Sequence, residues 1–135
     1  MRRNLILVFI ILLPMLIACQ QVKEGDVTVN QGGEISNLNE FKNFIENVEN
    51  EDKDSVRIVR YTTEGDPIFL ALEYNGKDIK YTYDNSQDEY AGSDKGEKST
   101  TCANLESSNT EDGIEYHLSD CSSDFGNYFN FKMPE

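Results

Sequence analysis

The chain of 135 residues is short enough for one domain, and a domain of this size buries a modest core. Its 25 acidic and 12 basic residues give a formal net charge of −13. Such a surface repels nucleic acid and anionic polymers, so no nucleic-acid partner is expected. Cations and basic protein faces fit as partners, although a strong net charge also serves solubility alone.

The N-terminus predicts an export signal. Arg2 and Arg3 form a short basic head, and residues 5–19 form an uncharged apolar run that contains Pro14. A membrane-spanning helix needs about 20 apolar residues, and an internal proline breaks its hydrogen-bond ladder. A cleaved signal peptide at residues 1–18 is therefore favoured over a permanent span. An ordinary signal or an uncleaved anchor is the alternative.

The apolar run ends in residues 16–19 (LIAC), which resemble a lipobox. The resemblance implies cleavage before Cys19 and transfer of a diacylglycerol to its thiol. At about 0.8 kcal/mol per buried methylene, one acyl chain anchors a protein marginally and two anchor it stably. We therefore predict lipid attachment at Cys19, with acyl chains such as palmitate, on the extracellular face of the cell membrane.

Residues 19–34 are predicted to form a flexible tether, because they are polar, contain two adjacent glycines and show no sustained period. Cleavage would remove two arginines and no acid, which leaves a formal charge of −15 on the mature chain. A single domain is expected over residues 35–135.

One amphipathic helix is predicted at about residues 37–50. Apolar side chains recur there at spacings of three and four, and Asn37 and Glu40 have the spacing of a capping box. The remaining chain is rich in branched and aromatic residues separated by turn signals. Strands are expected at residues 55–63, 68–74, 79–83, 98–108, 113–121 and 127–133.

Two turns set the predicted registers of the first three strands. A two-residue loop at Asn75-Gly76 would pair Leu72 with Ile79 and Leu70 with Tyr81. A loop over residues 63–66 would pair Tyr61 with Ile68 and Val59 with Leu70. Both place apolar residues on one face, which becomes the predicted core face.

The later hairpin predicts a disulfide. With residues 110–113 as its loop, Leu105 faces Leu118, and Cys102 lies directly opposite Cys121. The two cysteines remain once Cys19 is acylated, and an exported protein occupies an oxidising compartment. A pair of free thiols is the alternative, since hairpin registers slip. The expected fold class is α+β, with one helix packed on an antiparallel sheet of about five or six strands.

Few residues offer chemistry. His117 is predicted opposite Glu106 and beside Glu115, a pairing that can perform acid–base work only in a cleft with a bound substrate. Residues 84–90 alternate oxygen-bearing side chains like the start of a calcium loop, but Glu89 replaces the required glycine. No catalytic residues, no metal and no cofactor are therefore expected, and the protein is expected not to be an enzyme.

Two loops and surfaces suggest binding instead of catalysis. Residues 62–67 concentrate hydroxyls and acids, although turn formation alone explains their glycine and proline. Of the seven tyrosines, Tyr90, Tyr116 and Tyr128 are not committed to the predicted core face and are available for recognition.

Several segments resemble a family of small exported proteins from Gram-positive bacteria, catalogued as domain of unknown function 4362. They are residues 56–68 (VRIVRYTTEGDPI), 74–76 (YNG), Cys102, Tyr116, Leu118 and Cys121. The resemblance covers about residues 35–122, and residues 60–68 are its most specific part. It implies a short lipoprotein domain on the outer leaflet of a single membrane, and it supplies no activity.

We therefore expect a non-enzymatic lipoprotein of the cell envelope. Its expected partners are the lipid bilayer, through acylated Cys19, and an unidentified envelope protein or ligand. Two other functions remain open: an immunity or inhibitor-type lipoprotein that captures a basic partner, and a small envelope hydrolase that uses His117 with Glu106 or Glu115.

Overall fold

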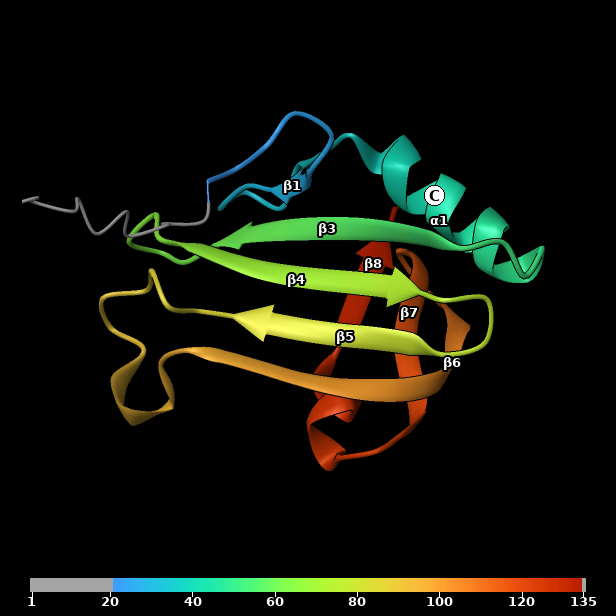
Figure 1. Cartoon of the computed structure of the whole chain (residues 1–135). Helices are drawn as coiled ribbons and strands as arrows, with labels where there is room; N and C mark the ends of the chain where they lie inside the picture. The colour runs from blue at the N-terminus through green and yellow to red at the C-terminus, as the bar shows by residue number, and fades with distance from the viewer. Residues whose placement is uncertain (1–20, 135) are drawn as a thin grey trace, which may run out of the picture.

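The structure, a computed structural model, describes residues 21–134. The expected signal peptide at residues 1–18 and the expected lipid site at Cys19 lie outside the described residues. Within residues 21–134, no helix has the length and apolar character needed to cross a membrane. Figure 1 shows the elements, which are β1 (Val27–Val29), β2 (Ile35–Ser36), α1 (Leu38–Glu49), β3 (Asp54–Tyr61), β4 (Pro67–Tyr74), β5 (Ile79–Asp84), η1 (Gly92–Asp94), β6 (Glu97–Thr110), β7 (Gly113–Cys121), η2 (Asp124–Tyr128) and β8 (Asn130–Met133).

The expected α+β class is confirmed, but the sheet differs from the expected one. It has eight strands in the order β2-β1-β3-β4-β5-β6-β7-β8, whereas five or six were expected. It is mixed, because β1 runs parallel to β3 while the other neighbouring strands are antiparallel. The two additional strands, β1 and β2, are only three and two residues long, too short for a recognisable period.

The structure corrects the expected flexible tether at residues 19–34 over the part that it describes, residues 21–34. Val27 is fully buried beside its strand partner Ile58. Next to it, the Asp26 carboxylate pairs with the Arg57 guanidinium at 2.5 Å, and both side chains are largely buried. This segment is therefore part of the folded domain from its first described residues.

The sheet curls because β6 pairs with two different neighbours along its length. Residues 97–102 pair with β5, and residues 102–110 pair with β7. As a result β7 and β8 lie behind β3, β4 and β5 and cross them, while α1 lies beside the same enclosed space (Figure 1). The ring of Phe41 on α1 packs against Phe131 at 4.4 Å and Tyr116 at 5.3 Å. The core fills this concave side.

The predicted helix at residues 37–50 is confirmed, although its start differs from the predicted capping box. Asn37 adopts a left-handed φ of 57° and makes no side-chain capping hydrogen bond. Its amide instead donates to the carbonyl of Asp26 at 2.9 Å, which ties the helix to β1. The Asn37 side chain, which was predicted to cap the helix, therefore makes a tertiary hydrogen bond instead.

The hairpin of β4 and β5 has a longer loop than predicted. Tyr74 pairs with Ile79 and Leu72 with Tyr81, so residues 75–78 form the turn. The Asn75 side chain stabilises it by accepting hydrogen bonds from the backbone amides of residues 77 and 78. The register changes by two residues, which leaves the same side chains on the core face.

The hairpin of β3 and β4 differs by one residue, and this difference matters. Tyr61 pairs with Pro67, and Ile58 with Leu70. A shift of one residue exchanges the two faces of a strand. Val59 and Tyr61 therefore lie on the convex face, contrary to prediction, and Arg60 lies on the concave face.

The predicted disulfide and its register are confirmed. Cys102 and Cys121 are directly paired and bonded, and Leu105 faces Leu118. Cys102 is also the point where β6 changes partners from β5 to β7. The disulfide therefore fixes the corner of the curled sheet.

Candidate functional site

A hollow of about 440 Å³ opens on the concave side, between the ends of β3–β5 and the segment formed by η2 and β8. Such a volume falls in the range of small-molecule sites. Its lining combines aromatic rings with a few polar groups, and consists of Arg60, Leu70, Tyr81, Tyr83, Asn85, Asp94, Lys98, Phe125, Tyr128, Phe129 and Asn130.

Aromatic side chains form the walls of this hollow. Phe125 of η2 stacks on Tyr81 at 5.2 Å with nearly parallel rings, and its edge meets Tyr83 at 6.0 Å. Phe129 packs edge-on against Tyr81 at 5.3 Å. Tyr128 is 76% exposed and lies at the rim. Tyr81 and Phe129 are buried by these contacts, so the aromatic surface that the hollow offers comes from Phe125, Tyr83 and Tyr128.

The most buried charged group of the hollow is Arg60, since Asp94 and Lys98 are exposed. Its Nη2 donates a hydrogen bond to the backbone carbonyl of Asn130, and no carboxylate within residues 21–134 forms an ion pair with it. Every fully buried side-chain nitrogen or oxygen of the described chain has a hydrogen-bond partner. Since Nε and Nη1 of Arg60 have none, they are accessible to solvent. They are therefore available to a ligand.

Burial tunes the groups around Arg60. Desolvation lowers the pKa of the Arg60 guanidinium, and the neighbouring hydroxyls of Tyr81 and Tyr83 partly oppose this. Burial raises the pKa of Tyr81 to about 12, with Arg60 acting in the opposite direction. Burial also raises the pKa of Tyr83, against a hydrogen bond from the Asn85 side chain. At neutral pH the hollow thus holds a cation beside two neutral phenols.

The disulfide positions the wall formed by η2. Gly126 packs so closely on it that a β-carbon would lie 2.2 Å from the sulfur of Cys121 and 2.8 Å from that of Cys102. Two further contacts hold the start of this segment, since the amides of Ser122 and Ser123 donate to the carbonyl of Thr101 and the hydroxyl of Thr100. Only glycine allows this approach, and it places Phe125 over Tyr81.

A second hollow of about 320 Å³ lies on the other side of Arg60, between β8 and the β1–β2 segment. Arg60 and Asn130 line both hollows. The other cation of this second hollow, Lys132, is already paired with Asp112 at 2.8 Å. Arg60 is therefore the cation without a carboxylate partner among residues 21–134 that lines both hollows.

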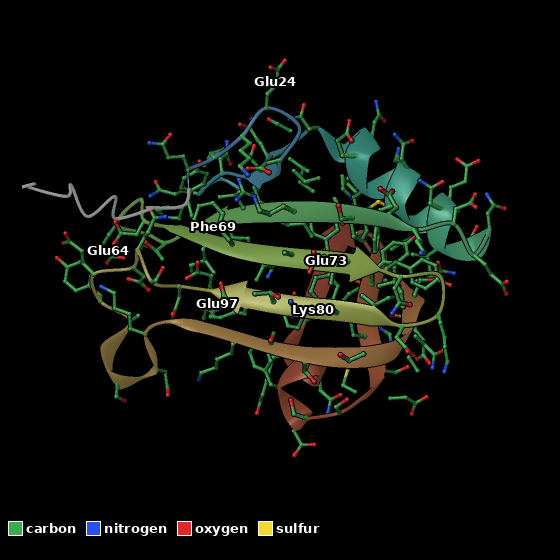
Figure 2. All side chains as sticks on the ribbon, in the orientation of Figure 1. Glu24, Glu64, Phe69, Glu73, Lys80 and Glu97 are labelled. Atoms are coloured by element: carbon green, nitrogen blue, oxygen red, sulfur yellow. A yellow bond between two sulfur atoms is a disulfide. The ribbon has the colours of Figure 1, made fainter. Side chains whose placement is uncertain are left out.

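The convex face carries a broad hollow of about 940 Å³ next to the N-terminal segment. Figure 2 shows Phe69, Glu73 and Lys80 on this face, turned away from β7 and β8. Two of its three cations are paired: Arg57 contacts Asp26 at 2.5 Å, and Lys80 lies 3.8 Å from Glu73. The third, Lys23, shares the lining with the acids Glu24, Glu40 and Glu97. Acids outnumber cations on this surface, whereas the lining of the concave hollow has an excess positive charge.

The predicted histidine pair is present but stands apart from these hollows. His117 lies opposite Glu106, with Nε2 and Oε2 3.4 Å apart, and both side chains are largely exposed. Glu106 also accepts a hydrogen bond from the hydroxyl of Ser119 at 2.8 Å. Neither His117 nor Glu106 lines any of the three hollows described. A substrate bound in one of these hollows would therefore not meet this pair.

The calcium-like segment uses its oxygens to form its own turn. Oδ1 of Asp84 accepts from the amide of Ser86, and Oδ1 of Asp88 accepts from that of Tyr90. In residues 21–134, no three His, Cys, Asp or Glu side chains are arranged to hold a metal ion. The loop at residues 62–67 also uses its polar groups for structure. The Thr62 hydroxyl accepts from the amide of Asp66, and the Asp66 carboxylate accepts from the amide of Glu89. The Gln31 side chain donates to the carbonyls of Thr62 and Thr63.

Arg60 was not among the residues expected to form a site. The predicted register placed it on the solvent face, where an arginine needs no explanation. The sequence did hold one signal. Arg60 alternates with Val59 and Tyr61, so one register turns Val59 and Tyr61 towards the core and the other turns Arg60 towards it.

A family model described as a domain of unknown function (DUF4362) matches residues 24–117, which include β1 and end within β7. No curated protein and no solved structure matches the chain. The match begins earlier than the expected resemblance, in agreement with the folded N-terminal segment. Because it covers more than half of the chain, the chain belongs to the DUF4362 family of domains of unknown function.

Proposed function

We propose that the protein is a lipoprotein anchored through Cys19 at the extracellular face of the cell membrane, and that its domain is a non-enzymatic binding module of the cell envelope. The observation that carries the binding function is the concave hollow, in which the guanidinium of Arg60 has no carboxylate partner among residues 21–134 and lies between aromatic walls.

The lipobox at residues 16–19 supports the anchor. In addition, the folded domain starts close to the anchoring residue, since the backbone carbonyl of Gln21 accepts a hydrogen bond from Arg57 at 2.7 Å. Two residues of extended chain span about 7 Å. A domain attached in this way would lie against the membrane surface, and its ligand or partner would be met there.

The chemistry of the hollow favours binding over catalysis. Arginine stays protonated at any physiological pH, and the pKa of Tyr81, about 12, keeps that hydroxyl neutral. A general acid or base works best when its pKa lies near the operating pH. These two groups therefore hold and orient a ligand and do not exchange protons with it.

The anchor is tested by the intact mass of the protein isolated from membranes. Cleavage before Cys19, a diacylglycerol on its thiol and one disulfide together fix the expected mass. The Cys19→Ala variant is expected to lose the lipid and to leave the membrane fraction. An unmodified Cys19 in the membrane-bound protein would contradict the proposal.

Binding at the hollow is tested by photo-crosslinking on intact cells. The crosslinker p-benzoylphenylalanine replaces Tyr128, at the rim of the hollow, or Tyr90, which does not line it. The two side chains are matched controls, because they are 76% and 73% exposed. We expect a discrete adduct from position 128 that position 90 does not give. The same adducts from both positions would refute binding at the hollow.

A further inference from the structure

We infer that the concave hollow binds a monocarboxylate that carries a flat or apolar group, with the carboxylate at Arg60 and the apolar group against Phe125, Tyr83 and Tyr128. This inference rests on the proposed binding function and adds the chemical class of the ligand.

The donors at Arg60 set the anionic part of the ligand. Nη2 already donates to the Asn130 carbonyl, whereas Nε and Nη1 have no partner among residues 21–134. A carboxylate offers acceptor lone pairs to such donors, and hydrogen bonds between ionised partners are about twice as strong as neutral ones. The half-buried position strengthens the attraction further, because the effective dielectric constant is lower than that of water.

The charge balance of the lining favours one negative charge. Lys98 is the other cation of the hollow, and it lies 3.6 Å from Asp94 with both side chains exposed. The lining therefore carries one uncompensated positive charge. A monocarboxylate neutralises it, whereas a phosphate dianion would leave a negative charge inside a strongly acidic protein.

The walls and the volume set the rest of the ligand. The half-buried Phe125 and Tyr83 and the exposed Tyr128 are the rings that a ligand can contact. The buried side chains of Tyr81, Phe129 and Leu70 support them. Aromatic pairs prefer the offset or edge-on geometries that such walls offer. A volume of about 440 Å³ accommodates a compact molecule of one or two rings, so the ligand is small.

The test is a calorimetric titration of the mature lipoprotein in detergent micelles with three probes. N-acetyl-phenylalanine carries one carboxylate and one ring, N-acetyl-phenylalaninamide has the same shape without the charge, and inorganic phosphate has charge without a ring. We expect the acid to bind at least about tenfold more tightly than either other probe, as for hydrogen bonds to a charged group. This comparison needs no variant.

Variants then locate the site. Arg60→Met removes the charge and is expected to weaken binding of the acid at least about tenfold. Arg60→Lys keeps the charge but changes the donor geometry, so an intermediate loss is expected. Lys77→Met is the control, because it removes one exposed positive charge in the β4–β5 turn, and it is expected to leave the affinity unchanged.

Equal affinity for the acid and the amide, tighter binding of phosphate, or no heat with any probe would each overturn the monocarboxylate assignment. Failure of the ligand class and failure of the proposed function give different results. A position-specific crosslink at residue 128 with no binding of the acid refutes the class and keeps the binding function. Loss of that crosslink as well refutes both.

Discussion

Replacing Gly126 with alanine tests whether the disulfide and η2 hold the binding wall in place. The new β-carbon would lie 2.2 Å from the Cys121 sulfur, 2.7 Å from the Cys121 β-carbon and 2.8 Å from the Cys102 sulfur. Van der Waals contact between such atoms requires about 3.5 Å or more. The disulfide is anchored by two paired strands, so η2 must move.

The cost follows from this overlap. Forcing an extra methyl group into a packed interior typically costs about 1–3 kcal/mol, and here one carbon meets three atoms at once. We therefore expect Gly126→Ala to lower the free energy of unfolding by about 2–3 kcal/mol. Movement of η2 also displaces Phe125 from Tyr81, so binding of N-acetyl-phenylalanine should weaken in the same variant.

Urea unfolding, followed by far-ultraviolet circular dichroism under non-reducing conditions, measures this change. Gly32→Ala is the control, because Gly32 is exposed, has no positive φ, and its added β-carbon would meet one atom, Oδ1 of the exposed Asn30 side chain, at 3.3 Å, so a shift of a few tenths of an ångström relieves the contact. The control is expected to change stability by less than about 0.5 kcal/mol. A Gly126→Ala protein as stable as the parent, with its disulfide intact, would refute the proposed packing.

Three further changes test other parts of the structure. The double variant Cys102→Ala, Cys121→Ala opens a loop defined by a sequence separation of 19, so urea unfolding should show a loss of about 3 kcal/mol. Asp26→Asn leaves the Arg57 guanidinium without its carboxylate and should cost about 2 kcal/mol in the same assay. Burial raises the pKa of Tyr81 to about 12. The contribution of the neutral Tyr81 side chain to the free energy of unfolding is therefore fully present below the ordinary tyrosine pKa of about 10, and it is lost as the pH rises towards 12. Absorbance at 295 nm should show a late ionising tyrosine that Tyr81→Phe removes.

Each of these results has a clear opposite. Unchanged stability without the disulfide would mean that the corner at Cys102 is held by other contacts. An Asp26→Asn protein as stable as the parent would show that the N-terminal segment contributes little to the domain. A Tyr81→Phe protein that keeps the late ionisation would assign that titration to another tyrosine.

The sequence predicted those parts of the fold that local chemistry specifies. The spacing of Phe41, Phe44 and Ile45 defined the helix, since three- and four-residue spacings are specific to one amphipathic face. The register of β6 and β7 was also correct, because Cys102 and Cys121 add a covalent constraint to the apolar pairing of Leu105 with Leu118. The disulfide and the apolar pairing are independent requirements, and a single register satisfies both.

The missed strands depend on tertiary contact. Val27–Val29 is three residues long, and its pairing partner in β3 lies about thirty residues further along the chain. A strand of three residues that pairs with such a distant segment is too short to show a recognisable hydrophobic period in the sequence. The glycines and polar residues around it resemble a linker, whereas the buried Asp26–Arg57 pair becomes visible only in the folded chain.

The candidate site was missed because of one residue of register. The sequence between Val56 and Tyr61 has apolar residues at both alternations, so the pattern fits either face. The predicted loop chose the register that exposes Arg60, whereas the actual loop turns it inward next to Tyr81 and Tyr83. A hairpin with an unambiguous alternation would have indicated the site.

The most direct test of the ligand-binding claim is the nuclear magnetic resonance signal of the Arg60 Nε–H group. In the ¹⁵N-labelled mature lipoprotein this signal is assigned by its disappearance in Arg60→Lys, and the protein is then titrated with N-acetyl-phenylalanine. A shift of the Arg60 signal that saturates with the acid, and that the amide does not reproduce, is the predicted result. An Arg60 signal that stays unchanged while the acid binds, or that responds equally to the amide, would contradict binding of a carboxylate at Arg60.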